Sequence, residues 1–135
     1  MILRLAFAVA FSIAVLGVAN AQAGSGHCGD HCGEAPEVRR WSEMVAAAGD
    51  WDVDEALSVI DCESGGDPNA RNRTSGAAGL TQLNGWGAKA LDLFGRHDLT
   101  DPWLNLQMAF YLWQQGGRRF DTQIGWIASV HCWAR

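Results

Sequence analysis

The strongest constraint on the fold is a series of segments in which apolar residues recur every three or four positions, as on one face of an α-helix. Glycines follow most of these segments, and typical helix-starting residues such as Asp52 or Asp101-Pro102 precede two of them. Alternating strand patterns are nearly absent. The helical segments cover residues 36–49, 52–64, 80–95, 101–116 and 121–130. The pattern predicts a mainly α domain of about five helices, with a long loop, able to form a short hairpin, over residues 65–79.

The first 23 residues have the layout of a secretory signal peptide. A short basic start ending at Arg4 precedes the apolar run 5–19, and Ala21-Gln22-Ala23 offers a small-x-small cleavage site. The run is short for a membrane span, although an uncleaved anchor is an alternative. We therefore expect export, to a periplasm, to the cell wall or to the medium, and a single domain over residues 36–135 after an irregular arm over residues 24–35.

The charge of the chain excludes several classes of partner. The formal net charge is −5, it becomes more negative when the leader with Arg4 is removed, and Lys89 is the single lysine. A chain of this kind is a poor ligand for nucleic acid or for an anionic membrane surface. We expect a monomer that binds neither nucleic acid nor, after removal of the leader, a membrane.

The arm contains the sequence HCGDHC, with Cys28 and Cys32 each following a histidine. Two cysteines and two histidines are ligand types that zinc accepts, but their spacing is tighter than in common zinc modules. Thiols of exported proteins also tend to oxidise. We favour a disulfide, either local or to another chain, over a metal site.

Glu63 occupies an unusual place, because it lies on the last turn of the predicted helix 52–64 with Leu57 and Ile60 on the buried face before it. The negative end of the helix dipole and an apolar neighbourhood both disfavour a charged carboxylate. We therefore predict a raised pKa for Glu63. A carboxylic acid that keeps its proton near neutral pH can protonate the departing oxygen of a glycosidic bond.

Two stretches resemble one known family. ESGGDPNARNRTSGAAGLTQL, over residues 63–83, resembles the core motif of the SLT-type lytic transglycosylases, relatives of goose-type lysozyme. Its parts are Glu63-Ser64, a loop rich in glycine, asparagine and alanine, and then Ser-Gly-Ala-Ala-Gly-Leu-x-Gln. DPWLNLQMAFYLW, over residues 101–113, is similar to the Asp-Pro-x-x-Asn…Tyr-Leu helix of the same family.

The resemblance implies a lysozyme-like catalytic domain that acts on peptidoglycan glycan strands. It implies cleavage between N-acetylmuramic acid and N-acetylglucosamine, with Glu63 as acid and then base, and a 1,6-anhydro-muramyl product. No metal or organic cofactor is implied. Ser75 corresponds to a serine near the catalytic glutamate and Gln82 to a glutamine of the sugar cleft, while Tyr111 belongs to the second motif. We include these three residues among the expected substrate-binding residues.

The chain departs from the family pattern at two places. Thr81 stands where methionine is common, and the late Ala-Tyr-Asn-Ala-Gly motif is missing, with Val130 and His131 where tyrosine and asparagine are expected. That tyrosine normally orients the glutamate, so His131 becomes a candidate substitute. The ending with Cys132 is similar to a secreted, disulfide-bearing branch of the lysozyme-like clan, such as the resuscitation-promoting factors.

Four cysteines allow three disulfide connectivities, which the sequence alone leaves open. We favour a bridge between Cys62 and Cys132, because it would tie the end of the helix carrying Glu63 to the end of the chain. Among seven tryptophans, Trp86 and Trp126 are the better candidates for stacking on sugar rings.

Three alternatives to a lytic transglycosylase stay open. The first is a lysozyme-type hydrolase that adds water, in which a second carboxylate such as Asp67 would approach Glu63. The second is a catalytically weak glycan-binding cell-wall protein. The third is a small disulfide-bonded interaction protein whose arm pairs with a partner.

Overall fold

The computed structural model describes residues 32–134, so the predicted signal peptide, Cys28 and most of the arm lie outside the described residues. The helices are α1 (Pro36–Arg39), α2 (Ser42–Ala48), α3 (Val53–Ser64), α4 (Gly87–Phe94), α5 (Pro102–Gln115), the 3-10 helix η2 (Ile127–Ser129) and α6 (Val130–Trp133). Within this part of the chain, β-structure is limited to isolated bridges that pair Ala78 with Arg71 and with Leu83. The fold is therefore mainly helical, as the sequence predicts.

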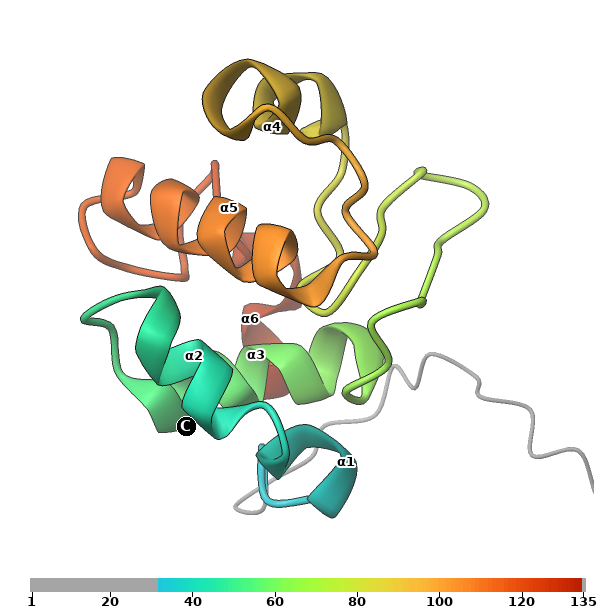
Figure 1. The fold of residues 1–135 in the computed structure, drawn as a ribbon. Coiled ribbons are helices and arrows are strands. Elements are labelled where there is room, and N and C mark those ends of the chain that lie inside the picture. The colour runs from blue at the N-terminus through green and yellow to red at the C-terminus, as the bar shows by residue number, and fades with distance from the viewer. Residues whose placement is uncertain (1–31, 135) are drawn as a thin grey trace, which may run out of the picture.

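Helix α3 is the central element of the fold. Its side chains Ala56, Leu57, Val59 and Ile60 are almost fully buried. Helices α1 and α2 pack on α3, α6 packs on it as well, and α5 contacts α2 (Figure 1). The long loop after α3 rises, light green to yellow in Figure 1, to the outlying helix α4. The carboxyl end of α3 thus lies where the helices meet this loop.

Capping follows the sequence at the two long helices. The side chain of Asp52 accepts a hydrogen bond from the amide of Glu55 at the start of α3, and Asp101 does the same for Leu104 at the start of α5. Each cap satisfies an amide that the first helical turn leaves without a partner. Both helix starts therefore lie where the sequence predicts them.

Aromatic rings fill the space between α2, α5 and the C-terminal segment. The ring of Trp51 lies 5.4 Å from that of Phe110 and 5.6 Å from that of Phe120, and Phe120 in turn contacts the rings of Trp126 and Trp133. Aromatic rings of this size bury large apolar areas and prefer such offset or edge contacts. The cluster fixes the C-terminal segment against the helical body.

Three predicted helix boundaries are wrong. The segment 36–49 is not one helix, because the chain breaks at Arg40–Trp41 between α1 and α2. The segment 80–95 is helical only from Gly87, and the segment 121–130 is helical only from Ile127, from which helical structure then continues to Trp133.

Core packing explains the false helix signal at residues 80–86. Leu80 and Leu83 are buried beneath the loop, but Gln82 between them has a left-handed backbone with φ of 50°. An α-helix cannot pass through such a residue. The apolar spacing here reflects two side chains that fill the core from a turn.

Candidate active site

The Ser-Gly-Gly sequence after Glu63 ends α3 sharply. Gly65 has φ of 61° and its amide bonds the carbonyl of Asp61, as expected for a glycine that terminates a helix. Gly66 lies against α1, where an added Cβ atom would come within 2.4 Å of the Glu37 carbonyl oxygen. The indole of Trp41 donates to the Gly66 carbonyl at 2.9 Å. Glu63 is therefore fixed on the last helical turn before the chain turns away.

Glu63 lines a cleft of about 420 Å³. The cleft lies between the end of α3, the 82–86 segment, α5 and the segment before α6. Its lining is made of polar amides, apolar side chains and two indoles: Glu63, Gln82, Leu83, Asn84, Trp86, Leu112, Gln123, Ile124, Gly125, Trp126, Ala128 and Ser129. Among these described residues, Glu63 is the only one that can donate a proton as an acid near neutral pH.

The environment of Glu63 favours its protonated form. Burial raises the pKa of this carboxyl above its ordinary value of 4.5, and a hydrogen bond from Ser129 offsets part of the increase. Burial acts in this direction because the charged form loses hydration. The direction agrees with the expectation from the sequence.

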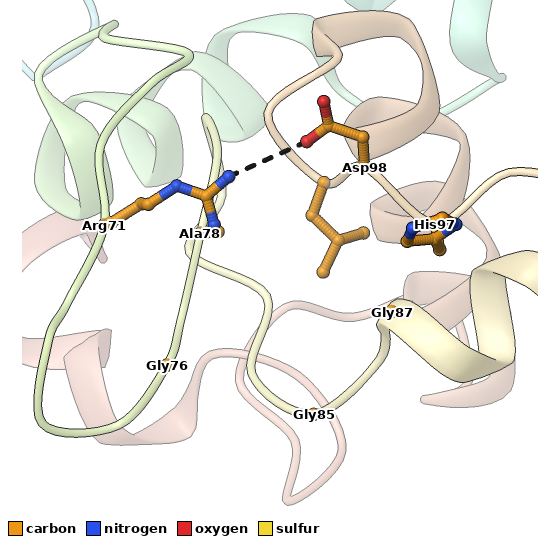
Figure 2. A pocket seen from close by; sticks show the side chains of 8 residues that line it. Arg71, Gly76, Ala78, Gly85, Gly87, His97 and Asp98 are labelled. Atoms are coloured by element: carbon orange, nitrogen blue, oxygen red, sulfur yellow. Dashed lines mark ion pairs between the residues drawn. The ribbon is translucent and has the colours of Figure 1, made fainter.

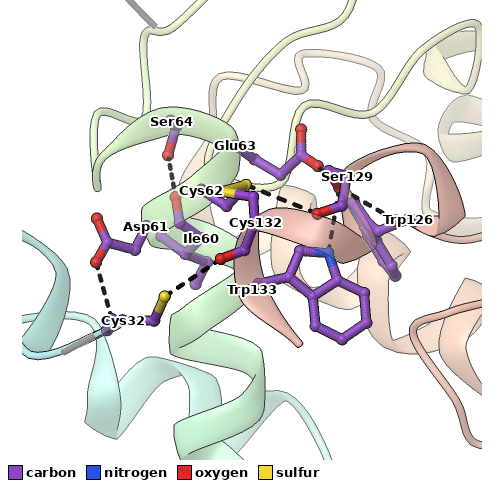
Figure 3. The surroundings of a disulfide bond; sticks show 11 residues. Cys32, Ile60, Asp61, Cys62, Glu63, Ser64, Trp126, Ser129, Cys132 and Trp133 are labelled. Carbon is purple, nitrogen blue, oxygen red and sulfur yellow. Dashed lines mark hydrogen bonds between the residues drawn. A yellow bond between two sulfur atoms is a disulfide. The ribbon is translucent and has the colours of Figure 1, made fainter. Parts of the chain in front are cut away.

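A short chain of hydrogen bonds orients the Glu63 carboxyl (Figure 3). The indole Nε1 of Trp133 donates to the Ser129 hydroxyl oxygen at 3.2 Å, and the Ser129 hydroxyl donates to Oε1 of Glu63. The Trp126 carbonyl oxygen lies 3.1 Å from the same hydroxyl as a second acceptor. Ser129 engages Oε1 in this way, and no hydrogen bond among the described residues is recorded for Oε2.

A disulfide between Cys62 and Cys132 lies beside this chain, and it confirms the favoured pairing (Figure 3). The two Cα atoms are 6.0 Å apart and 70 residues separate them in the sequence. Cys32 is also disulfide-bonded, and its sulfur lies 3.4 Å from the Cys132 carbonyl oxygen. The C-terminal segment that carries Ser129 is thus linked covalently to the residue next to Glu63.

Buried hydrogen bonds hold the opposite wall of the cleft. The side-chain oxygen of Asn105, on α5, accepts bonds from the amide and the hydroxyl of Thr81, while its amide nitrogen donates to the carbonyls of Ala78 and Leu99. The Thr81 carbonyl then accepts a bond from the Trp126 indole at 2.7 Å. Thr81 is buried and lies behind the cleft rather than in its lining.

The structure brings Gln82, Trp86 and Trp126 together with Glu63 in the cleft lining. The amide nitrogen of Gln82 donates to the carbonyls of Ala70 and Gly79, so this side chain also ties the loop together. Trp126 is 6% exposed and forms part of the floor of the cleft, whereas Trp86 is half-buried.

Ser75, Tyr111 and His131 lie outside the lining of this cleft. The hydroxyl of Ser75 accepts a bond from the Ala77 amide in an exposed turn. Tyr111 packs half-buried against the hydrophobic core, and His131 is exposed on α6. Asp67, the nearest candidate for a second carboxylate, is exposed and accepts a bond from the Asn69 amide in its own turn.

Sequence reasoning missed Ser129, Asn84 and Gln123. Ser129 immediately precedes Val130, the residue aligned above with the orienting tyrosine of the family. An alignment shifted by one residue would have placed Ser129 at that position. Asn84 and Gln123 carry no signal of their own, because single amides in loops are common.

The fold and the site together define a class: a lysozyme-like helical domain with one acidic carboxyl in a cleft of amides and indoles. The chain belongs to the transglycosylase SLT domain family, whose pattern it matches over residues 40–132. No curated protein and no solved structure matched the chain significantly. Membership of this family implies lytic transglycosylase activity on peptidoglycan in general terms, with peptidoglycan as the substrate that is bound.

The length and the apolar character of the described helices can be compared with those of membrane-spanning helices. Within residues 32–134, no helix has both the length and the apolar character that crossing a bilayer requires.

Proposed function

We propose that the protein is an exported lytic transglycosylase that cuts peptidoglycan between N-acetylmuramic acid and N-acetylglucosamine with Glu63 as its single catalytic acid and base. The observation that carries this proposal is the lining of the cleft, in which Glu63 is the only carboxyl among the described residues. Glycosidases that add water use a second carboxylate about 5 to 10 Å from the first. A cleft with one carboxyl favours attack by a hydroxyl of the sugar itself.

The reaction needs two proton transfers at Glu63. In the first, Oε2 gives its proton to the glycosidic oxygen, the bond from the muramic anomeric carbon to that oxygen breaks, and N-acetylglucosamine leaves with a free hydroxyl. In the second, the 6-hydroxyl of the muramic residue attacks the anomeric carbon and gives its proton to the Glu63 carboxylate. Glu63 regains its starting form, and the product carries a 1,6-anhydro ring.

Ser129 supports both halves of this cycle. Its hydroxyl donates to Oε1 of Glu63, which stabilises the carboxylate formed after the first transfer. The bond from Trp133 to the Ser129 oxygen points the hydroxyl hydrogen toward Glu63. Ser129 is thus a positioning residue, in the role that the resemblance assigns to a tyrosine.

The substrate-binding residues of this proposal are those that the cleft offers to a sugar chain. The half-buried indole of Trp86 provides a flat face for a pyranose ring. The amides of Asn84 and Gln123 provide donors and acceptors for hydroxyl and acetamido groups, and Gln82 provides its side-chain oxygen as an acceptor. The proposed reaction uses the Glu63 carboxyl and the 6-hydroxyl of the sugar, and it involves no metal or organic cofactor.

The Glu63→Gln variant tests the assignment, with Glu55→Gln as the matched control. Glu55 lies on the same helix, and burial raises its pKa as well, but it does not line the cleft. We expect Glu63→Gln to lose about a thousandfold or more of the rate of peptidoglycan solubilisation while it still sediments with the insoluble glycan. Glu55→Gln should remain as active as the wild type.

The glycan-binding alternative gives a different result in the same assay. A glycan-binding protein without catalysis would show no solubilisation by the wild type, and both variants would bind the wall equally. Equal activity of the wild type and Glu63→Gln would refute the role of Glu63.

A further inference from the structure

A second hollow, of about 520 Å³, borders the segment that also forms the cleft (Figure 2). Leu83, Asn84 and Trp86 of this segment face the cleft, whereas Gly85 and Gly87 line the second hollow. The rest of its wall comes from the 71–78 loop and from the residues before α5: Arg71, Gly76, Ala78, His97, Asp98 and Leu99. The two spaces are therefore neighbours that share one stretch of backbone.

Bare backbone forms much of this wall. Gly76 and Gly85 have φ of 77° and 70°, and a Cβ atom added to either would meet no atom within 4 Å. Neither glycine is required by close packing against a neighbour. Both leave open space in front of peptide groups, which an extended peptide can approach closely.

Two opposite charges at this hollow, Arg71 and Asp98, form a loose and exposed ion pair (Figure 2). Nη2 of Arg71 lies 3.8 Å from Oδ1 of Asp98, beyond hydrogen-bond distance, and the two side chains are 63% and 65% exposed. Asp98 is held by the amide and the hydroxyl of Thr100, and these hydrogen bonds lower its pKa below the ordinary value. The hollow thus presents an ionised carboxylate and a guanidinium that both have room for a further partner.

The position of Arg71 relative to the cleft is fixed. A bridge pairs Arg71 with Ala78, and Ala78 exchanges backbone hydrogen bonds with Leu83 at 3.2 and 3.1 Å. Leu83 lines the catalytic cleft. The backbone of Arg71 at the hollow and that of Leu83 at the cleft are therefore held at a constant distance, which a ligand occupying both spaces must span.

We infer that this hollow binds the peptide attached to the muramic residues of the glycan, with Arg71 meeting a carboxylate and Asp98 an ammonium group of that peptide. The inference rests on the proposed function, because it concerns the same substrate. A simple anion or a simple cation fits less well, since each would meet one like charge. A short peptide with both kinds of group satisfies both side chains, and it is joined to the sugar that the cleft holds.

Binding of the peptide alone tests the inference without catalysis. The Glu63→Gln variant of the full chain is titrated calorimetrically with a synthetic stem tetrapeptide that carries carboxylates and one free side-chain ammonium. We expect saturable binding, weakened about fivefold by Arg71→Ala or by Asp98→Ala, as is usual for exposed charge contacts. Arg73→Ala is the matched control: Arg73 is exposed in the same loop but does not line the hollow, so its loss should leave the affinity unchanged.

The ammonium group separates the two contacts. Acetylation of the peptide ammonium group should weaken binding to the Glu63→Gln protein about as much as the added Asp98→Ala substitution does. In the protein that carries both substitutions, acetylation should have no further effect on the affinity. Absence of peptide binding, or equal weakening by Arg73→Ala and Arg71→Ala, would overturn the inference.

Cleavage kinetics distinguish this inference from the proposed function. The wild type is given glycan strands with their peptides and strands from which an amidase has removed them. We expect a lower KM for strands with peptides, and we expect Arg71→Ala to lose that difference while kcat is kept. Equal KM values on both substrates would contradict the peptide site alone, whereas failure to cut either substrate would contradict the proposed function and leave the calorimetric result to decide the inference.

Discussion

The proton on Glu63 is controlled by two opposing influences from its immediate neighbours. Burial at the end of α3 raises the pKa, and the hydrogen bond from Ser129 lowers it. In the proposed reaction this balance would favour the protonated acid and still allow the carboxylate to form after the first proton transfer. Both influences can be changed by single substitutions, so they can be measured separately.

Ser129→Ala removes the hydrogen bond that favours the carboxylate, so the pKa of Glu63 should rise further. Because the acid must be protonated to act, the alkaline limb of kcat/KM against pH should move to higher pH. The optimum rate should also fall about tenfold, since the carboxyl loses its orientation. Ser129→Thr keeps the hydroxyl and should restore the wild-type limb; an unmoved limb in Ser129→Ala would contradict the role given to Ser129.

The same carboxyl makes stability depend on pH in a predictable direction. Its folded pKa lies above its ordinary value of 4.5, so the folded protein binds more protons than the unfolded chain between the two values. The free energy of unfolding should therefore fall as the pH rises from about 4.5 through the folded pKa, and then level off. Relative to the wild type, Glu63→Gln should gain stability across that window; urea titrations at a series of pH values measure it, and a constant difference would contradict the burial of the charge.

At the scale of elements, one buried side chain connects α5 to the loop that walls the cleft. Asn105 is fully buried and bonds Thr81, Ala78 and Leu99. The loop has no helix of its own over these residues, and its two bridges are isolated. Together with the bond from the Trp126 indole to Thr81 and the bonds of Gln82, this buried amide holds the cleft wall in place.

Asn105→Ala should destabilise the fold by about 3 kcal/mol, because buried amide, hydroxyl and carbonyl groups lose their partners. Gln114→Ala, at an exposed position of the same helix, should change the free energy of unfolding little. Chemical denaturation of the two variants measures the difference. A loss of equal size at both positions would contradict the role given to the buried bonds, because alanine itself favours the helix at either position.

The sequence predicts the helices that have strong local signals. It fails where contacts between residues far apart in the chain determine the backbone conformation or the partner of a side chain. Helices α3 and α5 begin at aspartate caps that any reader of the sequence can identify. The turn at residues 81–82 depends on the bond from Gln82 to Ala70 and on the bond from Thr81 to Asn105, and these partners are 12 and 24 residues away. The contact between Ser129 and Glu63 spans 66 residues, so only the family pattern, aligned one residue earlier, could have pointed to it.

At the scale of the whole molecule, the bridge from Cys62 to Cys132 closes a long loop and holds the C-terminal segment on α3. Replacing both cysteines by serine should lower the free energy of unfolding by about 4 kcal/mol, from the greater entropy of the unfolded chain. Activity should fall further than stability alone explains, because Ser129 is freed from Glu63. Thermal unfolding and activity at a temperature where the variant is fully folded measure the two effects; full activity there would contradict the orienting role of the segment.

The fate of water during cleavage tests the central claim most directly. Peptidoglycan is digested by the wild type in water enriched in oxygen-18, and the released fragments are weighed by mass spectrometry. A single-carboxyl transglycosylase should yield muramic ends that are lighter by one water than hydrolysed ends and carry no heavy oxygen. Muramic reducing ends labelled with oxygen-18 would mean that water is the nucleophile, and the assignment of the cleft as a transglycosylase site would fail.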